Sequence, residues 1–177
     1  MRWLRTVRYL RPVQIIGRLW IKAYRPRPDL SPAPGLRALS GQWYEPVQKR
    51  PTLLQPWRFR FLNVEHDLAG PADWNNPARD TLWLYNLHYF DDLNAESAAT
   101  RVEWHRELLS RWVAENPPTR GVGWAPYPTS LRIVNWIKWS LAGNTLPDEC
   151  RHSLAVQTRW LKRRLEYHLL GNHLFAN

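Results

Sequence analysis

Apolar residues recur at intervals of three and four in three stretches of the second half of the chain, which is the spacing of an amphipathic helix. The first stretch, residues 95–115, has Asn94 as its expected N-cap and ends before a pair of prolines. Glu107 and Arg111 are four residues apart and are expected to pair across one helical turn. The expected buried stripe is Val102, His105, Leu108, Leu109 and Trp112.

The second stretch, residues 129–143, is expected to be apolar around most of its circumference. Its stripe is Leu131, Val134, Ile137 and Leu141, widened by Ile133 and Trp136. Thr145 and Asp148 have the spacing of a capping box and are expected to open a third helix that runs to Gly171. The stripe of this helix is Leu154, Thr158, Leu161, Leu165 and Leu169. Helices joined by short loops with proline or glycine predict an antiparallel α-helical array.

The first part of the chain is patterned differently. Residues 12–24 predict a short helix with Ile16, Leu19 and Trp20 on one face and basic residues opposite, which suits either a docking helix or a helix on a membrane surface. Prolines recur through residues 25–56 and predict an extended arm. Residues 57–61 alternate apolar with basic side chains, as in a half-buried strand. We therefore expect a basic helix and Pro-rich arm over 1–56 and a helical domain over 57–177.

Residues 82–93 are dense in aromatic side chains, and a further helix is expected to open after Tyr85.

Charge and aromatic content narrow the possible partners. The formal net charge is +10, and the 177 residues include 12 Trp and 7 Tyr. A basic surface attracts nucleic acid, anionic lipid or acidic polysaccharide. Flat aromatic rings beside cations favour the last of these, because they stack on sugar rings while the cations meet carboxylate or sulfate. The single cysteine, Cys150, excludes an intramolecular disulfide and a zinc site made of cysteines.

Several motifs together resemble the heparinase II/III family, in particular the N-terminal part of members encoded with bacterial exopolysaccharide machinery. They are Phe61-Leu62-Asn63, the run from Leu82 to Leu93 that contains Asn86-Leu87-His88-Tyr89-Phe90-Asp91, the run from Gly123 to Trp136, and Gly171-Asn172-His173-Leu174. The resemblance covers nearly the whole chain.

The resemblance implies the first part of an (α/α) toroid, which in full-length members is followed by a β-sandwich domain. Lyases of the family cleave uronic-acid polysaccharides by β-elimination, with an Asn that neutralises the substrate carboxylate and matches Asn172. Their catalytic Tyr and His lie on later segments than those present here. The chain is therefore expected to be truncated at Asn177 and inactive alone, as an open array with a sticky face that needs the rest of the toroid and the β-sandwich.

The chemistry of the closing motif agrees with that implication. An amide can hold a carboxylate through neutral hydrogen bonds, and an imidazole can move a proton, so Asn172 and His173 are the candidate catalytic residues. The alternative for Asn172 is a helix C-cap, because Gly-Asn commonly follows a helix.

Two further clusters are candidates for substrate binding. Tyr85, His88 and Tyr89 share one helical face and form either the wall of a sugar cleft or an aromatic core. Trp124, Tyr127 and Arg132 form the second of these, and the loop from Gly121 to Trp124 is expected to be flexible enough to present Trp124. Arg132 is expected to bind a carboxylate or sulfate, or else to pair with a structural acid.

Other functions receive less support. Asp91 and Asp92 are adjacent and point about 100° apart on a helix, which disfavours a two-carboxylate glycosidase. No metal, cofactor or nucleic-acid motif is recognised, and none of these ligands is expected. A non-catalytic carbohydrate-binding or assembly module remains the alternative to a lyase. The sequence shows no signal peptide or membrane span, which predicts the cytoplasm, although the expected substrate suits the periplasm.

Overall fold

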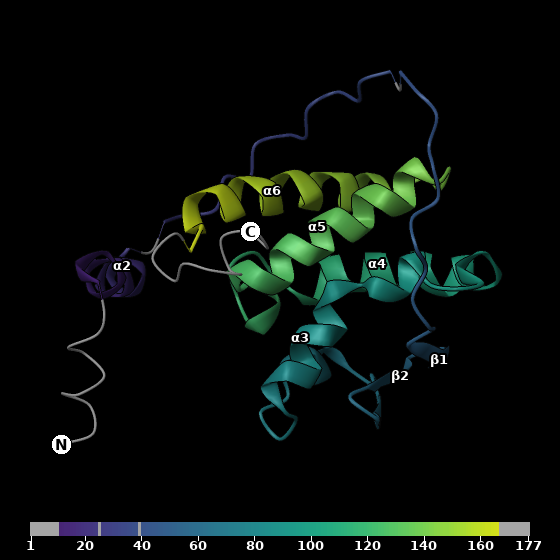
Figure 1. Cartoon of the computed structure of the whole chain (residues 1–177), viewed down its shortest axis with the longest axis horizontal. Helices are drawn as coiled ribbons and strands as arrows, with labels where there is room; N and C mark the ends of the chain where they lie inside the picture. The colour runs from purple at the N-terminus through teal and green to yellow at the C-terminus, as the bar shows by residue number, and fades with distance from the viewer. Residues whose placement is uncertain (1–10, 25, 39, 167–177) are drawn as a thin grey trace.

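The computed structural model of the chain describes residues 11–24, 26–38 and 40–166. It is mainly helical, with a small three-stranded antiparallel sheet (Figure 1), as the sequence predicts. The toroid that the resemblance implies stays a prediction. The elements in chain order are α2 (Pro12–Ala23), β1 (Leu53–Gln55), β2 (Arg58–Phe61), β3 (Val64–Asp67), η1 (Pro71–Asn75), α3 (Thr81–Tyr89), η2 (Asp91–Asn94), η3 (Ala98–Arg101), α4 (Val102–Glu115), η4 (Val122–Trp124), α5 (Pro126–Leu141) and α6 (Asp148–Arg164).

The sheet is a meander in the order β1-β2-β3. In β2 the side chains of Phe59 and Phe61 are buried and those of the intervening arginines lie toward solvent, so the predicted alternation is confirmed. Leu62 and Asn63 form the two-residue turn to β3, and both have positive φ angles, of 53° and 61°. Two positive φ angles suit the right-handed twist of a tight hairpin. The Phe61 ring meets the edge of Trp83 on α3 at 5.1 Å, which fixes the sheet against the helices.

Helix α3 begins earlier than the sequence analysis predicts. It starts at Thr81, because the Asp80 carboxylate accepts hydrogen bonds from the backbone N–H groups of Leu82 and Trp83 at 2.8 and 3.2 Å. These bonds satisfy two of the donors that every helix N-terminus leaves open. The prediction that the helix opens after Tyr85 is therefore wrong, and Tyr85 lies in the middle of α3.

The start of α4 also differs from the prediction. Residues 91–101 form two short 3-10 turns, and the α-helix begins only at Val102. Asn94 is not its N-cap, because the Asn94 side-chain amide donates to the Asn135 carbonyl on α5 at 3.1 Å. Arg111 pairs with Glu115 at 2.6 Å and not with Glu107. The Glu115 carboxylate is the better partner, since it is also held in place by the indole N–H of Trp74.

Helix α5 packs against α3 and α6, and α4 also packs against α6 (Figure 1). The predicted buried face of α5 is confirmed for Ile133 and Trp136 but wrong for Val134 and Ile137. Val134 and Ile137 are 45% and 41% exposed, whereas Ile133 is 8% exposed and Trp136 is fully buried. The buried face also carries the polar side chains Thr129, Ser130, Arg132 and Asn135. A search for apolar periodicity passes over that face because its polar members interrupt the pattern.

Helix α6 is shorter than predicted and buries a different set of residues. It begins at Asp148 with Pro147 at the N-cap position, so Thr145 is not the cap, and it ends at Arg164. Thr158, which the predicted stripe includes, is exposed. The buried residues of the helix are Cys150, Ser153, Val156, Gln157, Trp160 and Leu161.

The Pro-rich arm is extended as predicted, up to β1 at its end (Figure 1). Its backbone follows α6 near Ser31 and joins Ala95 through a single parallel bridge at Lys49. Helix α2 precedes the arm and agrees with the predicted helix to within one residue. Within the described ranges, no helix combines the length and the apolar character needed to cross a membrane.

The orientation of α5 can be tested with two matched substitutions. Ile133→Ala should lower the free energy of unfolding by about 2–4 kcal/mol, since it leaves a cavity in the core. Ile137→Ala, one turn further on the same helix, should cost less than about 1 kcal/mol because that side chain is largely exposed. Urea unfolding of the two variants measures the difference. Equal losses, or a larger loss for Ile137→Ala, would contradict the observed orientation.

Candidate functional site

The six predicted binding residues separate into a buried group and a partly exposed group. His88 belongs to the buried group and is fully enclosed. Its Nε2 lies 3.0 Å from the Trp74 carbonyl oxygen, and its Nδ1 accepts from the Trp112 indole N–H at 2.9 Å. Nδ1 must therefore carry no proton and Nε2 must donate, so the ring is neutral. Burial, together with the charge of Arg132, lowers the pKa of His88 to about 3.

Arg132 is also fully buried, and neither of its predicted roles is observed. Its Nε donates to Gln157 Oε1 at 2.9 Å, and its Nη1 donates to the Gly123 carbonyl at 2.8 Å. The guanidinium lies 3.9 Å from the centre of the Trp112 ring. No carboxylate of the described residues pairs with it. Burial lowers the pKa of Arg132, yet a guanidinium keeps its proton in proteins, so a cation is held here by neutral acceptors and an aromatic face.

The glycine loop before α5 is packed and does not present Trp124. A Cβ atom on Gly123 would lie 2.5 Å from His88 Nδ1, so only glycine lets the loop approach that ring. Trp124 is 3% exposed, and its indole N–H donates to the Asn116 carbonyl. The expectation of a flexible loop that offers Trp124 to a ligand is therefore wrong.

The other group consists of Tyr85, Tyr89 and Tyr127, which we call the tyrosine cluster. Tyr85 and Tyr127 are half-buried, whereas Tyr89 is buried. The Tyr89 and Tyr127 rings meet edge to face at 5.8 Å. Burial raises the pKa of Tyr85, and the charge of Glu166 raises it further. Burial and the neighbouring phenols also raise the pKa of Tyr89. The phenols of Tyr85 and Tyr89 therefore stay protonated at neutral pH.

The backbone under the tyrosine cluster is fixed by Asn135 on α5. The Asn135 amide donates to the Tyr89 carbonyl at 2.9 Å and to the Asp91 carboxylate at 2.8 Å. Lys49 of the arm pairs with the same carboxylate at 2.7 Å. The end of α3 is thereby joined both to α5 and to the arm, which holds two of the three tyrosines in a set position.

The two candidate catalytic residues, Asn172 and His173, lie outside the described residues. The described part of the chain reaches Glu166, six positions before Asn172 in the sequence. Glu166, the last described residue, is near enough to Tyr85 for its charge to raise the pKa of that phenol. The cluster is thus the part of the predicted site that the structure brings together.

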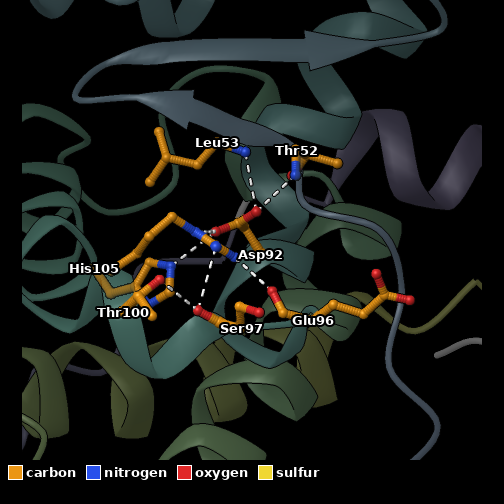
Figure 2. A network of polar contacts seen from close by, with 8 residues as sticks. Thr52, Leu53, Asp92, Glu96, Ser97, Thr100 and His105 are labelled. Carbon is orange, nitrogen blue, oxygen red and sulfur yellow. Dashed lines mark hydrogen bonds and ion pairs between the residues drawn. The ribbon is translucent and has the colours of Figure 1, made fainter.

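A buried polar network around Asp92 was not predicted (Figure 2). One carboxylate oxygen of Asp92 accepts from the backbone N–H groups of Thr52 and Leu53, at 2.6 and 3.0 Å. The other accepts from Arg101 Nε at 2.9 Å and His105 Nε2 at 2.8 Å. Burial disfavours the charged carboxylate, but these hydrogen bonds outweigh it, so the pKa of Asp92 lies below its usual value. The sequence signal for this network is His105, a histidine inside an apolar stripe, which indicates a buried polar partner such as Asp92.

The network joins the arm, η2, η3 and α4, and Asp92, Arg101 and His105 are all buried, so it links these segments as a structural unit. A groove of about 780 Å³ lies elsewhere, between arm residues 33–37 and the turn from α5 to α6. None of the described residues that line it is aromatic, so it offers no ring on which a sugar can stack. No group of three or more His, Cys, Asp or Glu side chains in the described ranges could hold a metal ion.

No protein-family model, curated protein or solved structure matches this chain at a significant level.

The structural role of Asp92 is tested by Asp92→Asn. The change leaves the buried Arg101 cation without its carboxylate and turns an amide toward groups that all donate. It should lower the free energy of unfolding by about 3–5 kcal/mol. Glu103→Gln, which removes the carboxylate of an exposed pair with Arg106, is the matched control and should leave the unfolding midpoint nearly unchanged. Similar small losses in both variants would contradict the role assigned to Asp92.

The buried state of His88 predicts a pH dependence. Its pKa in the folded chain is about 3, against about 6.5 when unfolded, so the unfolded chain binds one more proton in between. The stability contributed by His88 is therefore complete above pH 6.5 and is lost as the pH falls toward 3. Urea unfolding between pH 5 and 7 should show this slope, and His88→Gln should flatten it. His152→Gln, a half-exposed control, should leave it unchanged, and an unchanged slope in His88→Gln would refute the assignment.

Proposed function

We propose that this chain binds a uronic-acid polysaccharide at the tyrosine cluster, as the front part of a lyase of the heparinase II/III type. The observation that carries the proposal is the position of the cluster. Tyr85, Tyr89 and Tyr127 gather at one place on α3 and α5, and the charge of Glu166, the last described residue, acts on Tyr85. Partly exposed phenols offer a sugar both an apolar face and a hydrogen-bond donor.

The reaction itself is a β-elimination. A base removes the C5 proton of the uronate, the bond between C4 and the glycosidic oxygen breaks, and a C4–C5 double bond forms while the leaving oxygen takes up a proton. The uronate carboxylate opposes the first step because it is already negative. Neutral hydrogen bonds to that carboxylate, the role proposed for Asn172, stabilise the charge that develops, and one such donor contributes about 3 kcal/mol.

The described side chains suit binding better than proton abstraction. The pKa values of Tyr85 and Tyr89 are raised, so these phenols are poor bases at neutral pH. His88 is not a candidate base, because both of its ring nitrogens are hydrogen-bonded inside the core. We therefore assign Tyr85 and Tyr127 to sugar binding and leave the movement of the proton to His173, or to groups that the family carries on later segments.

The same observation supports the alternative, a non-catalytic module that binds acidic carbohydrate. Binding at the phenols needs no base, and both His88 and His105 are enclosed and bonded. The net charge supports nucleic-acid binding less strongly in the structure than it does in the sequence. Two of the arginines that give the chain its net charge, Arg101 and Arg132, are buried and do not contribute to a surface patch.

Binding is tested with the whole chain and three polymers, which are alginate, heparin and neutral dextran. We expect weak binding to the two acidic polymers that falls as salt rises, since exposed charges are screened within about 10 Å at 0.1 M salt. Tyr85→Phe and Tyr127→Phe each remove one donor and should weaken binding about three- to tenfold. Tyr44→Phe on the exposed arm is the matched control and should have no effect. Equal affinity for dextran, or equal effects of all three variants, would refute the proposal.

An ultraviolet assay for unsaturated uronate separates lyase from binding module. The chain alone should produce little or no signal, because a missing general base typically costs a factor of about 10²–10⁴. Strong product formation that His173→Ala abolishes would assign the base to His173. Strong formation that survives this change but not Tyr85→Phe would overturn the binding role given to Tyr85.

A further inference from the structure

Helix α2 exposes a continuous apolar face. Ile16 and Trp20 are 66% and 62% exposed, and Val13, Leu19 and Tyr24 are exposed as well. The Trp20 and Tyr24 rings stack on each other at 5.2 Å and so form one broad aromatic surface. None of the described elements packs extensively against this helix, and Figure 1 shows it apart from α3, α4 and α5. Exposed apolar surfaces of this kind mark sites of interaction.

The charge around this face has one sign. The first 24 residues contain six Lys or Arg and no Asp or Glu. Arg11 and Arg18 are exposed on α2, and helical geometry places them on the side away from Ile16 and Trp20. An apolar face with basic residues on the opposite side is the pattern of helices that lie in the surface of an anionic membrane.

The arm keeps α2 at one end of the molecule. Arginines of α6 donate to successive backbone carbonyls of the arm: Arg164 to Tyr24 at 2.8 Å, Arg163 to Arg27 at 2.9 Å, and Arg159 to Ser31 at 2.6 Å. Asp29 adds ion pairs to Arg159 and Arg163, at 3.9 and 4.0 Å. The chain is thus fastened directly after α2, near the end of α6 (Figure 1), while Ile16, Leu19 and Trp20 of α2 stay exposed.

We propose that α2 binds the surface of an anionic membrane and lies in its plane, with Ile16, Leu19 and Trp20 inserted at the boundary of the acyl chains. Twelve residues of helix are about 18 Å long, too short to span a hydrocarbon core of about 30 Å. A second copy of the chain fits less well, because two such segments carry the same charge and repel each other. The inference does not depend on the polysaccharide site.

The experiment uses the whole chain and sedimented vesicles of phosphatidylcholine alone or with a third phosphatidylglycerol. We expect binding to the anionic vesicles that falls with salt, and little to the neutral ones. Leu19→Asp should weaken binding at least tenfold. Leu82→Asp, at an exposed leucine on α3, is the matched control and should bind as the unchanged chain does. Far-ultraviolet circular dichroism and urea unfolding establish that both variants keep the fold of the body.

A fluorescent label shows which face enters the membrane. Cys150 is buried, so an environment-sensitive dye can be attached to Ile16→Cys or Gln14→Cys in the folded chain. The dye at position 16 should shift to the blue on anionic vesicles, and the dye at position 14 on the polar face should shift much less. The proposal is overturned if neutral vesicles bind equally well or if Leu19→Asp binds normally. It also fails if Leu19→Asp instead abolishes a self-association seen by light scattering without vesicles.

Discussion

A buried cation, Arg132, whose partners are neutral acceptors and not a carboxylate, organises this fold. The Arg132 guanidinium is held by oxygens of three other segments, at His88 on α3, Gly123 on η4 and Gln157 on α6, and it rests on the Trp112 ring of α4. Removing a charge from water costs several kcal/mol unless hydrogen bonds replace the lost solvent. The acceptors are available only when all of these segments are assembled. Arg132 therefore couples α3, α4, α5 and α6 through a single side chain.

The same constraint explains why the face of α5 could not be read from apolar periodicity. Periodicity assumes that a charged side chain marks the solvent side of a helix. Arg132 lies in the core together with Ile133 and Trp136, which were predicted to be buried, whereas Val134 and Ile137 of the predicted stripe turn outward. A similar exception occurs at Asp92, which the sequence presents as part of a polar pair and the structure encloses with Arg101 and His105.

Features that depend on local chemistry were predictable. The alternation in β2, the proline-rich arm and the existence of α2, α4, α5 and α6 follow from residues close in sequence. Helix starts were less predictable, because Asp80 and Asn94 are equally good cap residues in the sequence. Asp80 caps α3, whereas the Asn94 side chain is bound to Asn135 and caps no helix. The candidate site depends on contacts such as Asn135 with Tyr89, 46 positions apart, which no local pattern contains.

The positions of these residues in the structure change how the motifs behind the family resemblance are interpreted. His88, Gly123, Trp124 and Arg132 were candidates because of their chemistry, but their chemistry is used in the core, where His88 and Gly123 touch and Arg132 binds both backbones. These residues hold the helices together, so their presence says little about which substrate the chain binds. Ligand contacts are therefore left to side chains that the packing keeps partly open. Among the predicted residues that the structure describes, those are Tyr85 and Tyr127, and the charge of Glu166 acts on the first of them.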